Sequence, residues 1–227
     1  MIYQCHGGGT KDKPFKTLGY FIQYIVPAIK SYSAVRVFAL DDIVVDHQIT
    51  FLSIADNLYF QKTDTGKFIF NQKVLVNDSI IGFYGCEFNN GLDVFQRSYC
   101  YVSGGLLKQG SNDIRVRYNA SLTIDNVLGD IVFESTRLGN YFFLYNSAKL
   151  FLNGPFTLKG TFGVLIHAEA DSFVRVPTNT TISTEGEVKG KAYEIQRSSA
   201  LDLFGRGNNI FPESLTAGSA DQYSTIC

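Results

Sequence analysis

The chain has 227 residues, a formal net charge of −1 and a hydrophobic fraction of 45%, which fits one large all-β domain with a buried core. A near-neutral charge without a run of lysine or arginine argues against a nucleic-acid partner, because phosphate binding needs a basic face. No run of about 18 apolar residues is present, so we expect no membrane insertion. Only 18% of the residues are charged, so we expect much of the surface to lie between chains or to contact a weakly polar partner.

The four cysteines have no spacing typical of a metal site. Cys5, Cys86, Cys100 and Cys227 form no Cys-x-x-Cys pair. We therefore predict no metal site. The pattern is typical of free thiols in a protein made in a reducing cytoplasm, and a Cys86–Cys100 disulfide stays open as an alternative.

Residues 1–34 predict an opening turn followed by a capping helix. Pro14 suits a first helical turn, and apolar residues recur at spacings of three and four from Phe15 to Ile29, which is one face of an α-helix. Pro27 is expected to end or kink the helix. One amphipathic helix before a β chain would cover the open end of its core.

From Val35 onward the apolar period changes to two, which is typical of β-strands. Each run is three to six residues long and is bounded by turn-forming asparagine, glycine, aspartate or serine. The predicted strands are 35–39, 49–52, 58–60, 68–70, 74–76, 80–83, 92–95, 114–118, 122–124, 131–133, 141–145, 150–152, 163–166, 173–176, 192–195 and 201–204.

Two all-β architectures fit these strands. A sandwich would show hairpin turns such as Asn-Gly, and only Asn90-Gly91 matches. A solenoid would show weak repeats of twenty to thirty residues. One series of strands begins at Leu122, Leu150, Phe173 and Leu201, at intervals of 28, 23 and 28 residues. The spacing favours a single-stranded parallel β-helix over residues 35–207, which we expect to be right-handed, followed by a C-terminal tail over 208–227.

A second series predicts the register of the stacked strands. Ile131, Val164 and Tyr193 would form one inward column, and Phe133, Ile166 and Ile195 the next. The adjoining outward column would hold Glu134, His167 and Gln196, and earlier members would be Ile81, Phe83 and Tyr84. A shift of one residue would turn every one of these side chains to the opposite face.

Two short stretches carry a family resemblance. The first is Gly7-Gly-Gly-Thr10 with Lys13-Pro-Phe-Lys-Thr-Leu18 and the helix through Ile25, and the second is Asn208-Asn-Ile-Phe-Pro-Glu-Ser-Leu-Thr-Ala-Gly218 with Gln222-Tyr223. They resemble the two ends of bacteriophage tail-fibre and tailspike proteins with a pectin-lyase-like β-helix. Segment 19–25 departs from the family's alanine-rich helix, Phe211 is inserted before the proline, and Glu213 replaces a glycine. The two matches cover about a fifth of the chain.

The resemblance implies a parallel homotrimer at the tip of a phage tail, made in the host bacterial cytoplasm. It implies attachment to a bacterial surface polysaccharide, either capsule or lipopolysaccharide, and contacts with other tail or baseplate proteins. No cofactor is implied. Two alternatives stay open: a polysaccharide depolymerase, which would be a hydrolase or a lyase on the same fold, and a structural shaft or cap without a ligand.

Glycan hydrolysis would need two carboxylates about 5–9 Å apart. Strands of neighbouring turns lie about 4.8 Å apart, so acids one or two turns apart can form such a pair. The candidate catalytic residues are Glu134, Glu169 and Asp171, with Glu194 as a weaker candidate. The alternative is that these are solvated acids at strand ends.

Binding would use flat aromatic rings for the C–H faces of sugars and polar side chains for the hydroxyl groups. The candidate ligand-binding residues are Tyr84, Arg97, Tyr99, Tyr118, Tyr145 and His167. His167 could equally be a neutral structural residue of the stack.

The remaining polar candidates have structural interpretations. Asp41, Asp42 and Asp46 form an acidic turn, with a Ca²⁺ site as the alternative. Asn71 and Asn119 resemble positions at which amide side chains hydrogen-bond along a solenoid.

Overall fold

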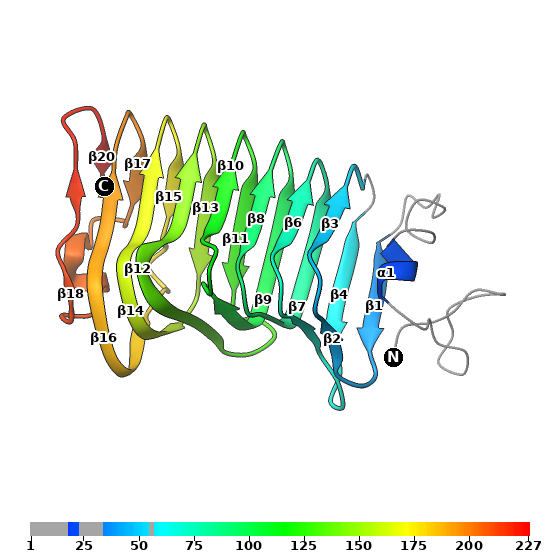
Figure 1. Ribbon diagram of the computed structural model, residues 1–227. Coiled ribbons are helices and arrows are strands. Elements are labelled where there is room, and N and C mark those ends of the chain that lie inside the picture. The colour runs from blue at the N-terminus through cyan, green and yellow to red at the C-terminus, as the bar shows by residue number, and fades with distance from the viewer. Residues whose placement is uncertain (1–17, 23–33, 55–56) are drawn as a thin grey trace.

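The computed structural model describes residues 18–22, 34–54 and 57–227. These residues form a parallel β-solenoid of about eight turns, in which the chain advances steadily from one end to the other (Figure 1). The predicted all-β parallel β-helix is confirmed. We call one turn of the solenoid a rung.

Each rung has three bends, so the stacked strands form three faces. Face A contains β1 (Val35–Ala39), β4 (Leu58–Lys62), the first halves of β7 (Ile80–Phe88) and β9 (Tyr99–Lys108), β11 (Ser121–Asp125), β13 (Lys149–Asn153), β15 (Phe173–Arg175), β17 (Ala200–Asp202) and β20 (Thr225–Ile226). Face B contains β2 (Ile43–Val45), β5 (Phe68–Phe70), the second halves of β7 and β9, and the first halves of β12 (Ile131–Tyr145), β14 (Phe156–Glu169) and β16 (Ile182–Ile195). Face C contains β3 (Ile49–Leu52), β6 (Val74–Asn77), β8 (Leu92–Phe95), β10 (Ile114–Arg117), the second halves of β12, β14 and β16, and β19 (Ser219–Ala220).

Aromatic rings fill much of the core, because parallel pairing stacks equivalent inward positions directly above one another. Phe60 and Phe83 stack at 5.6 Å between ring centroids, and Phe83 contacts Phe88 edge to face at 5.0 Å. A second stack joins Phe133 and Phe156 at 5.0 Å. All five rings are buried, so the alternation of apolar and polar residues along the strands places the hydrophobic set inside.

The bend from face C to face A repeats on successive rungs. Two consecutive non-glycine residues adopt positive φ there, as at Gln96-Arg97 and Tyr118-Asn119. A small buried residue follows each pair, and the amide of Ser79 donates to the Ser98 hydroxyl at 3.3 Å. This tight bend needs small inward residues and projects the side chains of Arg97 and Tyr118 outward, since both are exposed.

Asn71 lies in an amide ladder at the bend between faces B and C, as predicted. Its Nδ2 donates to Asp46 at 2.7 Å, and Asn89 Nδ2 donates to Asn71 Oδ1 at 2.8 Å. Asp42 accepts a hydrogen bond from the backbone amide of Lys67 at 3.1 Å, so Asp42 and Asp46 both stabilise turns between strands. Asn119 is exposed at the bend between faces C and A and is not part of this ladder.

The first predicted strand series is correct within one residue. Leu122, Leu150, Val174 and Leu201 form one column, so Phe173 is displaced by one position from the predicted column.

The second predicted register is wrong. Phe133 pairs with Leu158, whereas Phe142, Ile166 and Tyr193 share a column. Strands β12, β14 and β16 each run from face B around the bend to face C as one long strand, with glycines and shifts of register inside it. The predicted columns therefore joined the first half of one strand to the second half of the next. The backward extension fails for the same reason, because Ile81 and Phe83 lie on face A.

The two ends contribute to the same stack. Helix α1 (Leu18–Tyr20) and the residues after it place Leu18 and Phe21 in the core, and the rest of the predicted 14–29 helix lies outside the described residues. Residues 208–227, predicted as a tail, contain β18 (Leu215–Thr216), β19 and β20, which pair with β16 and β17. The 3-10 helix η3 (Gly207–Ile210) precedes them.

Cys86, Cys100 and Cys227 are free, so the Cys86–Cys100 disulfide does not form. Cys86 and Cys100 are buried in the core, and burial raises the pKa of both thiols. A buried protonated thiol is unreactive.

Candidate functional site: a tyrosine groove on face A

Four tyrosines gather on the outer surface of face A. Tyr59 lies on β4, Tyr84 on β7, and Tyr99 and Tyr101 on β9, so three consecutive rungs supply them. The ring centroids of Tyr59 and Tyr84 are 5.6 Å apart, and those of Tyr84 and Tyr101 are 5.5 Å apart. We call this cluster the tyrosine groove.

A glycine makes room for two of the rings to pack closely against the strand beneath them. Gly82 stands in register between Tyr59 and Tyr101, at a position whose side chain would point outward. A Cβ atom there would lie only 2.3 Å from Cδ1 of Tyr59 and 3.2 Å from Cε2 of Tyr84. The pocket beside these rings has a volume of about 220 Å³ and is lined by the four tyrosines together with Asn57, Ile80 and Ile81. A glycine inside a strand often marks a site that another group approaches closely.

Polar groups line the far side of the groove. The Tyr101 hydroxyl donates to Asp125, which also accepts the Ser103 hydroxyl at 2.6 Å. Tyr99 donates to Thr123 at 3.3 Å. Burial raises the pKa of Tyr84, and burial together with the Asp125 carboxylate raises the pKa of Tyr101. The phenols of Tyr84 and Tyr101 are therefore neutral at physiological pH.

The structure brings together only some of the predicted ligand-binding residues. Tyr84 and Tyr99 lie in the groove, whereas Tyr118 lies at the bend from face C to face A, and Tyr145 and His167 lie on face C. Arg97 lies at the same bend as Tyr118 and forms an ion pair with Asp78 at 3.2 Å.

Sequence reasoning did not select Tyr59 or Gly82 as site residues. The glycine inside an apolar strand was the signal that could have identified the groove.

Face C carries a network of mutually satisfied charges. Asp93 is fully buried and binds Lys73 at 3.0 Å and Arg117 at 3.0 and 2.8 Å. The Arg117 guanidinium lies 5.0 Å from the centroid of Phe95 and 5.7 Å from that of Tyr118. These cations are already paired, so they hold the face together and have little left to offer a ligand.

His167 lies farther along face C between two acids. Its Nδ1 is 3.4 Å from Oε2 of Glu194, its Nε2 is 4.0 Å from Oε2 of Glu169, and Phe143 packs edge to face at 5.3 Å. The hydrogen bond from Lys191, at 2.7 Å, is the main reason that the pKa of Glu194 is lowered. The other acid, Glu169, has Arg197 at 3.4 Å.

The three candidate catalytic acids do not share a site. Glu134 lies on face B, 2.7 Å from Lys108 and in register with Lys159, so the predicted contact with His167 is wrong. Glu169 lies on face C, and Asp171 is exposed at the bend from face C to face A.

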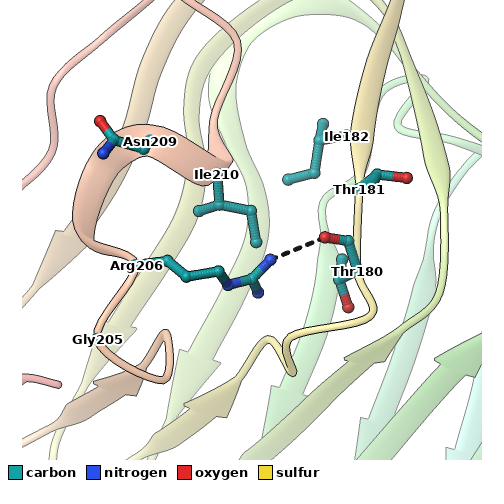
Figure 2. Close-up of a pocket in the computed structure, with 7 residues that line it drawn as sticks. All are labelled: Thr180, Thr181, Ile182, Gly205, Arg206, Asn209 and Ile210. Carbon is teal, nitrogen blue, oxygen red and sulfur yellow. Dashed lines mark hydrogen bonds between the residues drawn. The ribbon is translucent and has the colours of Figure 1, made fainter.

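A larger pocket lies near the C-terminal end, and Arg206 fills its polar side. Figure 2 shows the guanidinium directed toward Thr180 between η3 and the start of β16. All of its nitrogens donate to backbone carbonyls, which belong to Leu203, Thr178, Thr180, Val176 and Pro177. A guanidinium has five N–H groups, so this arginine closes the loop and has no donor left for a ligand.

Among the described residues no three potential metal ligands lie together, and no helix is long and apolar enough to cross a membrane.

Comparison with known proteins gives no match: no family model, no curated protein and no solved structure matches this chain.

Proposed function

We propose that the chain is a polysaccharide-binding module and that the tyrosine groove is its binding site. The observation that carries the proposal is the set of half-exposed tyrosine rings, spaced 5.5–5.6 Å apart over a glycine notch. Sugar rings have apolar C–H faces that pack on aromatic rings, and their hydroxyl groups need partners such as Asn57, Thr123 and the tyrosine hydroxyls. A groove across successive rungs suits an extended chain of repeating units.

The groove favours binding over hydrolysis. A glycoside hydrolase needs two carboxylates in one site. The carboxylate at the described groove is Asp125, and it already accepts hydrogen bonds from Tyr101, Ser103 and the Val127 amide. The groove therefore has the aromatic surface of a binding site without a free pair of acids.

We also propose a biological setting for this module. The β-solenoid fold and the resemblance at both ends of the chain support a phage tail fibre or tailspike. Its ligand would be a bacterial capsule or lipopolysaccharide, it would act as a homotrimer at the tail tip, and tail or baseplate proteins would be its other partners. A solenoid with open flanks would gain from trimer contacts that bury them.

One observation favours a second candidate, a depolymerase on face C. Glu169 and Glu194 flank His167 beside the Phe143 ring, which brings two carboxylates and a base to one surface. Both acids are ion-paired, so they would have to exchange these partners for a substrate.

The test is to incubate the purified protein with surface polysaccharides from a panel of bacterial strains and to follow retention and glycan size by chromatography. We expect one polysaccharide to be retained at full length. Replacement of Tyr84 by alanine should weaken binding about tenfold, since a stacked ring is removed from the centre of the groove. Tyr223→Ala removes a tyrosine that is 70% exposed near the C-terminus and should leave binding unchanged.

Other outcomes of the same experiment discriminate between the candidates. Shortening of the polysaccharide that stops in Glu194→Gln but persists in Tyr84→Ala would establish the depolymerase on face C. Failure of every polysaccharide to bind would refute the proposed function and favour a structural shaft or cap.

A further inference from the structure

The cations of the described residues are almost all neutralised by a neighbour. The lysines and arginines with a carboxylate within 4.0 Å are Lys67, Lys73, Arg97, Lys108, Arg115, Arg117, Arg137, Lys159, Arg175, Lys189, Lys191 and Arg197. Arg206 has its guanidinium bound to backbone carbonyls instead. Pairing of this kind is expected where parallel strands align opposite charges on adjacent rungs.

Three cations depart from this rule in the part of the chain that the structure describes. Arg36, Lys62 and Lys149 have neither a carboxylate partner nor a side-chain hydrogen bond there, and all three are exposed. They belong to β1, β4 and β13, which are all strands of face A. The cations that are left unpaired are therefore on the face that carries the tyrosine groove.

The strand register places two of the three in line with tyrosines of the groove. Arg36 is in register with Tyr59, one rung away, and its charge acts on the Tyr84 hydroxyl. Lys149 is in register with Ser121, which in turn is in register with Tyr99.

Lys62 lies at the bend between faces A and B, at the end of the same strand that carries Tyr59. The aliphatic part of its side chain lies over Gly85, which follows Tyr84, so a Cβ atom at Gly85 would come within 2.2 Å of the lysine Cδ. The glycine thus leaves room for a long side chain whose ammonium group stays in solvent.

We propose that the tyrosine groove binds an anionic polysaccharide, whose acidic substituents are held by Arg36, Lys62 and Lys149. This inference rests on the proposed function and specifies its ligand class. Rungs are spaced about 4.8 Å apart, so β1 and β13, five rungs apart, lie about 24 Å from each other. That distance accommodates several consecutive sugars, with rings on the tyrosines and anionic groups beside the cations.

The anionic substituent is a carboxylate or a phosphodiester, because both accept hydrogen bonds from guanidinium and ammonium groups. Unpaired cations on a groove also raise the rate of encounter with a polyanion, and this attraction is screened by salt.

The experiment uses a polysaccharide from the bacterial panel that the full chain binds. The dissociation constant is measured at increasing ionic strength for the wild type and for the combined variant Arg36→Gln, Lys62→Gln, Lys149→Gln. We expect the variant to bind about tenfold or more weakly and to lose most of the salt dependence. The matched control removes three paired surface cations outside face A, in Lys67→Gln, Lys159→Gln, Lys189→Gln, and should bind as the wild type does.

Chemical reduction of the ligand's carboxyl groups separates the two anions. Loss of binding after reduction would assign carboxylates, and persistence of salt-dependent binding would assign phosphodiesters; both results support the inference. A neutral polysaccharide that binds through Tyr84 with equal affinity to the wild type and the combined variant would overturn the inference and leave the proposed function intact. Equal weakening by the control triple would also overturn it, and absence of all binding would remove both proposals.

Discussion

The tyrosine groove on face A and the charge network around Asp93 on face C use the same residue types in opposite ways. On face C, Arg117 closes on the buried carboxylate of Asp93 and lies over the ring of Phe95. On face A, Arg36 has no carboxylate partner among the described residues, and the tyrosine rings stand over a glycine notch. A tyrosine or arginine in the sequence can therefore serve the fold or serve a ligand, and pairing on the neighbouring rungs decides which.

The difference has an energetic basis. A charge that is buried must be paired, because an unpaired buried ion costs several kcal/mol. An exposed cation loses little by remaining free, since water solvates it and a surface ion pair contributes only about 0–1 kcal/mol. Free cations are therefore tolerated at the surface of face A, and the network around Asp93 is required on face C.

The largest effect is expected from removing the buried carboxylate of face C. Asp93→Ala should lower the free energy of unfolding by about 3 kcal/mol, since Lys73 and Arg117 would lose their shared partner. Denaturant unfolding measures the change. The control Asp171→Asn alters an exposed acid and should change the free energy by less than about 0.5 kcal/mol. Equal stability of the two variants would show that the face C network is not structural.

A smaller effect is expected from filling the glycine notch of face A. Gly82→Ala places a Cβ atom where the Tyr59 ring lies and should cost about 1–3 kcal/mol of stability, as overpacking usually does. It should also weaken polysaccharide binding, because the displaced ring no longer borders the groove. In a Tyr59→Ala background the same substitution should cost little, and a double-mutant cycle of unfolding free energies measures this coupling. An undiminished cost in that background would mean that the ring is not what the methyl group displaces.

The smallest effect concerns pH on face C. The pKa of Glu194 lies below its ordinary value of 4.5, chiefly through the hydrogen bond from Lys191. A carboxyl whose pKa is lowered by folding adds stability above the ordinary value, and this stability is lost as the pH falls through the lowered pKa. Lys191→Gln should raise the pKa of Glu194, as followed by NMR titration of the carboxyl carbon.

Lys149→Gln provides the matched control for that titration. It removes a lysine from face A, which has no contact with Glu194, so the pKa of Glu194 should stay where it is. A shift of the same size in both variants would indicate a general effect of net charge rather than the local contact.

The fold was readable from the sequence wherever turn residues separate the strands. Leu122, Leu150 and Leu201 were assigned to one column because short strands with clear ends repeat there at similar intervals. The second series failed at β12, β14 and β16, because each runs around the corner as one long strand and the prediction joined the first half of β12 to the second halves of β14 and β16. A periodicity of two shows that a residue is in a strand, but it does not show which face of a long bent strand holds that residue.

The candidate site was predictable only in part, for a related reason. Tyr84 and Tyr99 were selected for their chemistry, and they lie in the groove. Glu134 was placed beside His167 by a register that proved wrong, and it pairs with Lys108 on face B. Residue type was sufficient to propose the kind of contact, but the choice of partner depends on register.

Alternating apolar residues and turn residues were enough to specify strands, stacking and an aromatic core, because these depend on local propensity and on the burial of apolar surface. The stacking of the rungs decided which tyrosines meet, which charges neutralise one another and which cations stay free. Those outcomes depend on contacts between residues about 25 positions apart in the sequence, which the stacking brings within about 5 Å. A shift of the register by one residue would change all of these contacts.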